Sequence, residues 1–291
     1  LPLRSIMPIE GPNRMGMMPG AMREPPAFGM KLISLYPGNP EAGYSSHQGA
    51  MVLFEAKHGA AVAMMNAGLL TAIRTAAASA VATRALARED SSVLAIVGTG
   101  EQAEHHLGAM LAVHDIREVR VAGRRAERAE HFAAEARRKH PQAKVSAGTD
   151  IRAAVDGADI VCTVTSAVEP ILEGAWIAPG THLNVVGSSI PAMREIDEET
   201  VLRAQIFVDY RPSTFAQAGE IIAALESGRI TKDHILAEIG EVVSGVKPGR
   251  TDERAITLYR SLGIAAQDIA CAHYCLRRAE ERGLGVRAPL D

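Results

Sequence analysis

The chain has 291 residues, of which 47% are hydrophobic and 22% are charged, with a formal net charge of −3. This length predicts one large domain or two ordinary domains of about 100–200 residues each, with a core that needs no disulfide or metal support. The near-neutral charge and the scattered lysines and arginines disfavour a nucleic-acid partner, and charged residues interrupt every apolar run that could span a membrane.

Cysteines and histidines give no sign of a metal site. The chain has three cysteines, and so few in this length favour a reducing cytoplasm. Cys271 and Cys275 would share one helix face, where core packing is the expected role. His105 and His106 have no further ligand at zinc spacing. The chain opens on Leu1 without an initiator Met or a recognisable signal peptide, which suggests a fragment or a renumbered chain.

The first part of the chain predicts a small sheet followed by a helix. Residues 15–20 and 36–40 are rich in Gly, Pro and Met and favour turns. Three segments are typical of strands: residues 30–36, 50–55 and 60–65. Because no helix separates them, they do not form a nucleotide-binding fold. Residues 69–88 carry apolar side chains at helical spacing, with arginines on the polar face.

The pattern changes at Ser92, where apolar runs of strand length begin to alternate with helical segments. Strands are expected at residues 92–97, 118–122, 144–147, 159–164, 182–186 and 205–209. This alternation predicts an α/β fold with a Rossmann-type, doubly wound parallel sheet over residues 91–263. A last helix at residues 264–282 is expected to pack on the first domain. Residues 1–90 and 264–291 would then form one smaller, discontinuous α+β domain.

A glycine-rich motif follows the first of these strands. Residues 98–103, with the sequence GTGEQA, match G-x-G-x-x-[G/A], a pattern with about 0.2 chance matches in such a chain. Its place between an apolar strand and a helix favours a dinucleotide loop, whose glycines allow a tight turn and close approach to a pyrophosphate. The predicted cofactor contacts are Gly98, Thr99, Gly100, Glu101 and Gln102. An ordinary strand-to-helix turn is the alternative.

The end of the next strand bears on which dinucleotide binds. NAD enzymes usually carry Asp or Glu there to hold the ribose 2′-hydroxyl, whereas this chain has Gly123-Arg124-Arg125. Two guanidinium groups can hold a 2′-phosphate, so Arg124 and Arg125 predict a preference for NADP(H) over NAD(H). A solvated cation at the start of a helix is the alternative for Arg124.

Short motifs spread over the chain carry a family resemblance. They are Pro2-Leu-Arg-Ser, Met30-Lys-Leu, Ser46-His-Gln, Arg74-Thr-Ala-Ala, Glu169-Pro-Ile-Leu, Gly240-Glu-Val and Ser261-Leu-Gly-Ile-Ala-Ala-Gln-Asp. Together they resemble the ornithine cyclodeaminase/mu-crystallin family over essentially the whole chain, with some tens of N-terminal family residues absent. The resemblance implies a homodimer whose smaller domain binds substrate and mediates dimerisation. It also implies hydride exchange at the α-carbon of an amino or imino acid.

The resemblance places Arg4, Lys31 and Arg74 as contacts of a substrate carboxylate. The chemistry agrees, because carboxylates bind cationic donors and a charge in an apolar helix, as at Arg74, is costly without a partner. The alternatives are an ion pair with a nearby acid for Arg74 and a solvent-facing position for Lys31. His47 is a candidate proton relay on the substrate side, since imidazole titrates near neutrality. A satisfied loop histidine is the alternative there.

Family cyclodeaminases carry an aspartate in a Gly-Gly-Asp-x-Pro-Gly-like loop, where this chain has GSSIP at residues 187–191. Ser189 stands at the aspartate's position, which argues against cyclodeamination because a hydroxyl is a poor base. Lys31 and Ser189 are the predicted catalytic residues, with a turn or cap serine as the alternative for Ser189. Further cofactor contacts are expected in loops that follow strands, at Thr165, Ser166, Val186, Gly187, Ser188, Ser261 and Gly263.

The leading hypothesis is NADPH-dependent reduction of a cyclic imino acid to an L-amino acid such as proline. The substrate would be Δ1-pyrroline-2-carboxylate or its six-membered homologue. Arg74 and Arg4 would hold the carboxylate, and Lys31 would bind the same end or supply a proton. Three alternatives stay open: an amino-acid dehydrogenase acting on alanine, an ornithine cyclodeaminase, and an NADPH-dependent small-ligand binder without catalysis.

Overall fold

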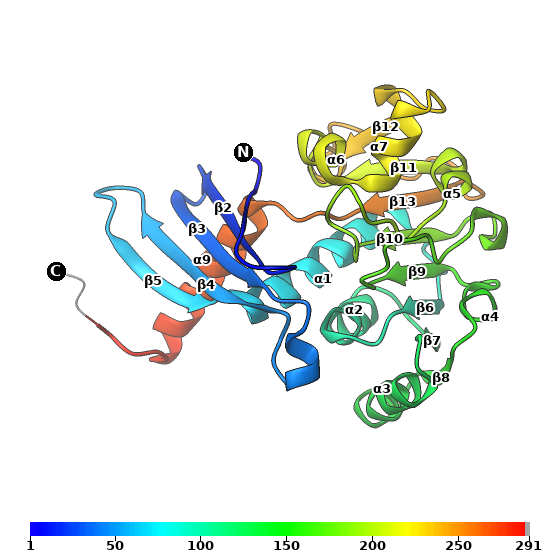
Figure 1. The fold of residues 1–291 in the computed structure, drawn as a ribbon, viewed down its shortest axis with the longest axis horizontal. Coiled ribbons are helices and arrows are strands. Elements are labelled where there is room, and N and C mark those ends of the chain that lie inside the picture. The colour runs from blue at the N-terminus through cyan, green and yellow to red at the C-terminus, as the bar shows by residue number, and fades with distance from the viewer. Residues whose placement is uncertain (289–291) are drawn as a thin grey trace. The chain divides into compact units, whose positions relative to one another are not determined.

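A computed structural model describes residues 1–288 of the chain, which divide into two compact units. The small unit contains residues 1–74 and the chain from Gly263 onward, and the Rossmann unit contains residues 75–262. Figure 1 shows a five-stranded sheet in the first and a larger sheet with its helices in the second. The predicted α/β class, with a Rossmann-type sheet and a second sheet domain, is confirmed.

The small unit is an antiparallel sheet with a long helix on one face. Its strands pair in sequence order: β1 (Ser5–Pro8), β2 (Arg14–Met22), β3 (Ala27–Leu35), β4 (His47–Glu55) and β5 (Ala61–Asn66). A 3-10 turn, η1 (Asn39–Ala42), precedes β4, and helix α9 (Ala265–Arg282) packs across β2, β3 and β4. The strand register aligns Met18, Lys31 and Met51 on one buried face of this sheet.

The prediction of a turn at residues 15–20 is wrong, because this segment is the middle of β2. Its glycines serve packing rather than chain reversal. A Cβ at Gly20 would lie 2.7 Å from the Cβ of Ala265 on α9, so the strand and the helix approach more closely than a side chain would allow. Composition alone therefore predicts a turn where the chain forms a strand. The small residues of that strand allow a helix to pack against it.

Helix α1 (Ala67–Leu86) corresponds to the helix predicted at residues 69–88. The Asn66 side chain accepts a hydrogen bond from the backbone N–H of Leu69 at 3.0 Å, which satisfies one free donor of the first turn. The division between the two units falls within this helix, after Arg74.

The Rossmann unit contains an eight-stranded sheet in which every pair is parallel. In chain order the strands are β6 (Val93–Val97), β7 (Glu118–Ala122), β8 (Lys144–Gly148), β9 (Ile160–Thr163), β10 (His182–Val185), β11 (Ala204–Val208), β12 (Ile235–Glu238) and β13 (Ile256–Arg260). Their spatial order is β12-β11-β13-β10-β9-β6-β7-β8. The chain reverses its direction across the sheet between β6 and β9, which is the switch point where such sheets bind ligands.

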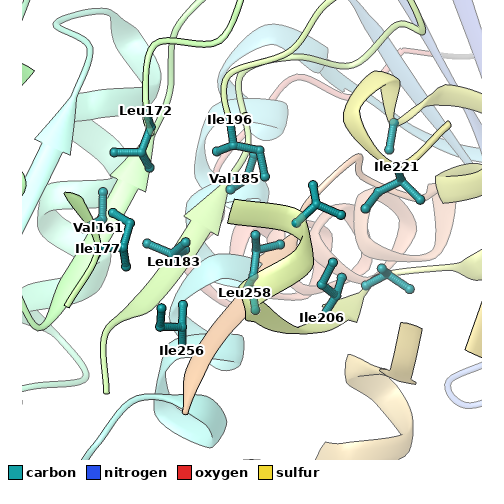
Figure 2. Close-up of a cluster of buried hydrophobic side chains, with 14 of the residues drawn as sticks. Val161, Leu172, Ile177, Leu183, Val185, Ile196, Ile206, Ile221, Ile256 and Leu258 are labelled. Atoms are coloured by element: carbon teal, nitrogen blue, oxygen red, sulfur yellow. The ribbon is translucent and has the colours of Figure 1, made fainter. Parts of the chain in front are cut away.

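Helices cover both faces of this sheet. These helices are α2 (Glu101–Leu111), α3 (Ala126–Lys139), α4 (Ile151–Val155), α5 (Glu198–Arg203), α6 (Arg211–Gln217), α7 (Gly219–Glu226) and α8 (Ile239–Val243), with 3-10 turns η2 (Gly174–Trp176) and η3 (Lys232–His234). One hydrophobic cluster includes side chains of α2 and α3, a second those of α4, α5 and α7, and a third those of α1 and α8. Figure 2 shows the second cluster around Leu183, Val185 and Leu258.

Strand β13 is absent from the sequence-based prediction, although it lies between β10 and β11 in the sheet. Its sequence, ITLYR, ends on a charge, yet all five residues are buried. Arg260 is accommodated by an ion pair with the buried Glu220, so the strand does not show the continuous apolar run of a central strand. Among residues 1–288, no helix is long and apolar enough to cross a membrane.

Candidate active site

A buried carboxylate in the small unit binds two of the three predicted substrate cations. Asp268, on α9, accepts hydrogen bonds at its Oδ1 from Lys31 Nζ and from Arg74 Nε, both at 2.9 Å. All three side chains are at least nine-tenths buried. The alternative of a solvent-facing Lys31 is therefore wrong. The ion pair named as the alternative for Arg74 is present, with Asp268 as its partner.

The guanidinium of Arg74 is held by more than this one acid. Its Nη1 donates to Gln267 Oε1 at 3.1 Å, and a Cβ at Gly263 would lie 2.3 Å from the same nitrogen. Gly263 also has a positive φ of 79°, so glycine is the residue that fits there. The structure thus places Gly263, a predicted cofactor contact, against the guanidinium of Arg74 within the small unit.

The cations of this group act on one another through space. Burial and the charges of Arg74 and Arg4 together lower the pKa of Lys31 to about 7, although Asp268 opposes them. Lys31 and Arg74 thus share the negative charge of Asp268, and the charge of Arg4 also acts on Lys31. A bound carboxylate would relieve this excess positive charge, so the group has the electrostatic character of an anion site.

His47 begins β4 and interacts electrostatically with the same cations. Its Nδ1 lies 2.9 Å from the hydroxyl of Ser46. Partial desolvation lowers the pKa of His47, and the charges of Lys31, Arg4 and Arg74 lower it further, although the residue is exposed. The imidazole is therefore mainly neutral at neutral pH. The structure brings Arg4, Lys31, His47 and Arg74 into one electrostatic group.

Sequence reasoning missed the role of Asp268, the acid at the centre of this group. In the sequence, Asp268 stood out only as the last residue of the family motif that begins at Ser261. The signal that could have found it is an acid among the small and apolar residues of the first turns of α9. Its second oxygen, Oδ2, is buried and has no hydrogen-bond partner among the described residues.

The predicted dinucleotide loop joins β6 to α2 in the Rossmann unit. Gly98 has a φ of 124°, and a Cβ there would lie 2.9 Å from the Val164 carbonyl oxygen, so the tight turn requires glycine. Gly100 precedes α2, and a Cβ on it would meet nothing within 4 Å, which leaves space over the first turn of the helix. The backbone N–H groups of Glu101 and Gln102 belong to that turn, where a pyrophosphate would bind.

Three further predicted cofactor positions follow neighbouring strands. Arg124 and Arg125 come directly after β7 and are exposed, with Arg125 at the start of α3. Thr99 packs against the adjacent glycine, because a Cβ at Gly123 would lie 2.7 Å from its Cγ2. The loop that would bind phosphates and the arginine pair are therefore adjacent.

The loops after β9, β10 and β13 carry the other predicted contacts. Gly187 and Thr165 are in close backbone contact, since a Cβ at Gly187 would lie 2.0 Å from the Thr165 carbonyl oxygen. Their neighbours Ser166, Val186 and Ser188 occupy the same two loops, and Ser189 follows them half-buried. Ser261 donates its N–H to Val185 at 3.0 Å. Because all these strands are parallel, the loops lie at one edge of the sheet, next to the dinucleotide loop.

The glycine loop and the carboxyl-end loops of the Rossmann unit are typical of a nicotinamide-nucleotide-dependent oxidoreductase. The chain belongs to the ornithine cyclodeaminase/mu-crystallin family, whose pattern it matches over residues 4–283. It is 36% identical over 272 residues to a ketimine reductase mu-crystallin of Mus musculus, covering 93% of this chain and 82% of the relative. It is 32% identical over 288 residues to a Δ1-pyrroline-2-carboxylate reductase of Bacillus cereus, covering 98% and 88%.

Solved structures show the same fold. A Δ1-pyrroline-2-carboxylate reductase of Thermococcus litoralis, in complex with NADH and L-proline, superposes with a TM-score of 0.95 at 37% identity, covering 99% of this chain and 89% of that one. An archaeal alanine dehydrogenase dimer with bound NAD gives 0.92 at 30% identity, covering 100% and 88%. The predictions of family, of a nicotinamide nucleotide cofactor and of an oxidoreductase acting on CH–NH or C=N bonds are thereby confirmed.

The lowered pKa of Lys31 predicts a pH dependence of stability. Between pH 7 and about 10 the unfolded chain binds a proton at Lys31 that the folded chain has largely lost, so the unfolding free energy of the wild type rises with pH. Lys31→Met removes this contribution, which has a slope of up to about 1.4 kcal/mol per pH unit. Urea denaturation at several pH values measures the difference. Lys57→Met, in an exposed turn, is the control, and parallel pH profiles for Lys31→Met and wild type would contradict the prediction.

Proposed function

We propose that this enzyme reduces a cyclic imino acid carboxylate with NADPH, giving an L-amino acid such as proline, and works in a reducing cytoplasm. The observation that carries the proposal is the buried group of Lys31, Arg74 and Asp268, whose net charge favours a small carboxylate. The names of the relatives support the choice of substrate, because two of them act on ketimines or on Δ1-pyrroline-2-carboxylate. The three cysteines are free, which fits the compartment.

In this proposal, different side chains of the cationic group serve substrate binding and proton transfer. The Nε of Arg74 donates to Asp268 and its Nη1 donates to Gln267, so Nη2 of Arg74 and the guanidinium of Arg4 provide the donors for the substrate carboxylate. A bound carboxylate stabilises the charged form of Lys31, whose pKa of about 7 otherwise leaves it partly neutral. Lys31 can then hold a proton close to the imine nitrogen, where protonation makes the C=N carbon a better hydride acceptor. A reduced nicotinamide, when bound, supplies the hydride.

Two further positions support the proposed type of reaction and the proposed choice of cofactor. Ser189, on the loop after β10, has no carboxylate with which to hold a substrate ammonium group, so it favours imine reduction over cyclodeamination. Arg124 and Arg125 are exposed beside the glycine loop and carry the charge that a 2′-phosphate needs. The fit of the glycine loop to a dinucleotide rests on Gly98 and on the open space at Gly100.

A panel of substrates tests the proposed activity directly. NADPH should be consumed with Δ1-pyrroline-2-carboxylate and its six-membered homologue. Arg74→Lys should lower kcat/KM by about tenfold to a hundredfold. The compact ammonium of lysine cannot form the paired hydrogen bonds of a planar guanidinium, and charge-assisted hydrogen bonds contribute about 1.5–3 kcal/mol. Arg84→Lys, at an exposed position of the same helix, should leave the rate unchanged.

Each rival function gives a different outcome of the same panel. Turnover confined to 2-oxo acids with ammonia would identify an amino-acid dehydrogenase. Proline and ammonia formed from ornithine, without net change in NADPH, would identify a cyclodeaminase. Binding of a small carboxylate without any turnover would leave only a ligand binder.

The arginine pair predicts the cofactor preference. Arg124→Ala should lower the ratio of kcat/KM for NADPH to that for NADH by about tenfold or more, because one of two guanidinium groups on the 2′-phosphate is lost. Steady-state kinetics with both cofactors measure this ratio. Arg128→Ala, exposed one turn later on α3, is the matched control. An unchanged ratio in Arg124→Ala would remove the basis for NADP selectivity.

A homodimer is also proposed, on the face of the small sheet opposite α9. That face carries Phe28, Met30, Leu32, Val52, Phe54, Val62 and Met64. Met64 is 78% exposed and Val62 is 41% exposed, and the rings of Phe28 and Phe54 stack at 5.1 Å. A contiguous apolar face of this kind marks an interaction surface. The archaeal alanine dehydrogenase relative is described as a dimer, which supports this assembly.

Met64→Glu should convert the dimer into a monomer. A charge placed in an apolar interface cannot keep its hydration when the two faces meet, so association weakens. Light scattering should give about twice the chain mass of 30.9 kDa for the wild type and the chain mass for the variant. Val246→Glu, at another exposed apolar position in the Rossmann unit, should remain dimeric. A monomeric wild type would refute the assembly.

A further inference from the structure

Glu195 is a fully buried carboxylate that bonds to two of the loops at the carboxyl edge of the Rossmann sheet. Its Oε1 accepts from the backbone N–H and the hydroxyl of Thr165, both at 2.7 Å. Its Oε2 accepts from the backbone N–H of Gly187 at 2.6 Å and from the hydroxyl of Thr163 at 2.9 Å. One side chain therefore joins the loop after β9 to the loop after β10.

The distribution of the four donors fits the carboxylate of a glutamate better than a glutamine amide or a shorter aspartate. Each oxygen receives one backbone N–H and one threonine hydroxyl. A hydroxyl can turn and become an acceptor, but a backbone N–H cannot. A glutamine would therefore point its NH₂ group at the N–H of either Thr165 or Gly187, and an aspartate would be too short to reach both loops.

The backbone of Glu195 is itself fixed in place. Its carbonyl oxygen accepts from the N–H groups of Ile171 at 2.9 Å and Leu172 at 3.0 Å, and the next residue, Ile196, pairs with Leu172 and is fully buried. Burial raises the pKa of Glu195, while the hydrogen bonds from Thr165 oppose that shift. The acid is thus a rigid support rather than a mobile side chain.

The two loops are also in direct contact where the carboxylate joins them. A Cβ at Gly187 would lie 2.4 Å from the Thr165 backbone nitrogen and 2.5 Å from Glu195 Oε1. The glycine permits this spacing and the carboxylate holds it. Each loop continues into a predicted cofactor contact, Ser166 in one and Ser188 in the other, and the Ser188 hydroxyl bonds to the Ala167 carbonyl at 3.2 Å.

We propose that Glu195 is a positioning residue for the nicotinamide nucleotide, which it serves by fixing the spacing of the loops after β9 and β10. The inference rests on the proposed function only in that a nicotinamide nucleotide binds at this edge of the sheet. Glu195 lies beneath the loops and touches no reacting atom. Its effect reaches the cofactor through the backbones of Thr165 and Gly187.

Glu195→Gln tests this role, with Glu130→Gln on the surface of α3 as the matched control. The affinity for NADPH, measured by fluorescence titration, should fall about tenfold or more in Glu195→Gln. The KM for NADPH should rise in parallel, while the KM for the imino acid, whose cationic contacts lie in the other unit, should change less than about threefold. Glu130→Gln should match the wild type in every constant.

Thr163→Val keeps the test decisive if Glu195→Gln fails to fold. It removes one hydroxyl donor from Oε2 and leaves the backbone of both loops unchanged. The affinity for NADPH should fall in the same direction, by about threefold to tenfold. Wild-type affinity in either folded variant would overturn the inference, and so would equal losses in both KM values. A wild-type protein that binds no nicotinamide nucleotide would instead refute the proposed function.

Discussion

The negative charge of Asp268, shared between Lys31 and Arg74, is the constraint on which the small unit depends. Removing one partner of a buried ion pair leaves the other charge without compensation, so the three residues must be kept together. They come from β3, α1 and α9, which are far apart in the chain. The ion pairs therefore also join the C-terminal helix to the sheet. An arrangement with two cations on one acid keeps the group deficient in negative charge, which is the condition for binding a carboxylate.

The Rossmann unit uses a buried carboxylate in a different way. Asp268 bonds to charged side chains, whereas Glu195 bonds to backbone N–H groups and hydroxyls. The first arrangement sets a local charge, and the second sets a distance between two loops. A third buried acid, Glu220, pairs with Arg260, whose guanidinium also donates to backbone carbonyls at Val185 and Ser188. The loop after β10 is thus held from both sides by charge-assisted hydrogen bonds.

The sequence made the nucleotide-binding half of the fold easy to predict, because its signals are local. The GTGEQA loop and the arginines after β7 lie within a few residues of the strands that position them. Strand β2 was missed because Gly16, Pro19 and Gly20 have the composition of a turn, and the packing of Gly20 against Ala265 on α9 involves a residue far along the chain. Strand β13 was missed because the partner that lets Arg260 be buried is on α7.

The same distinction between local signals and contacts far apart in the chain applies to the candidate active site. Lys31 and Arg74 were selected through the family resemblance, and Arg74 also as a charge in an apolar helix, whereas nothing local links their shared acid, Asp268, to either residue. This matters for the chemistry, because Asp268 raises the pKa of Lys31 while burial and Arg74 lower it to about 7. Neither a lysine in solution nor one paired only with an acid would titrate there. The proposed imine reduction needs a single proton beside its hydride, and a lysine with a pKa of about 7 can exchange one near neutrality.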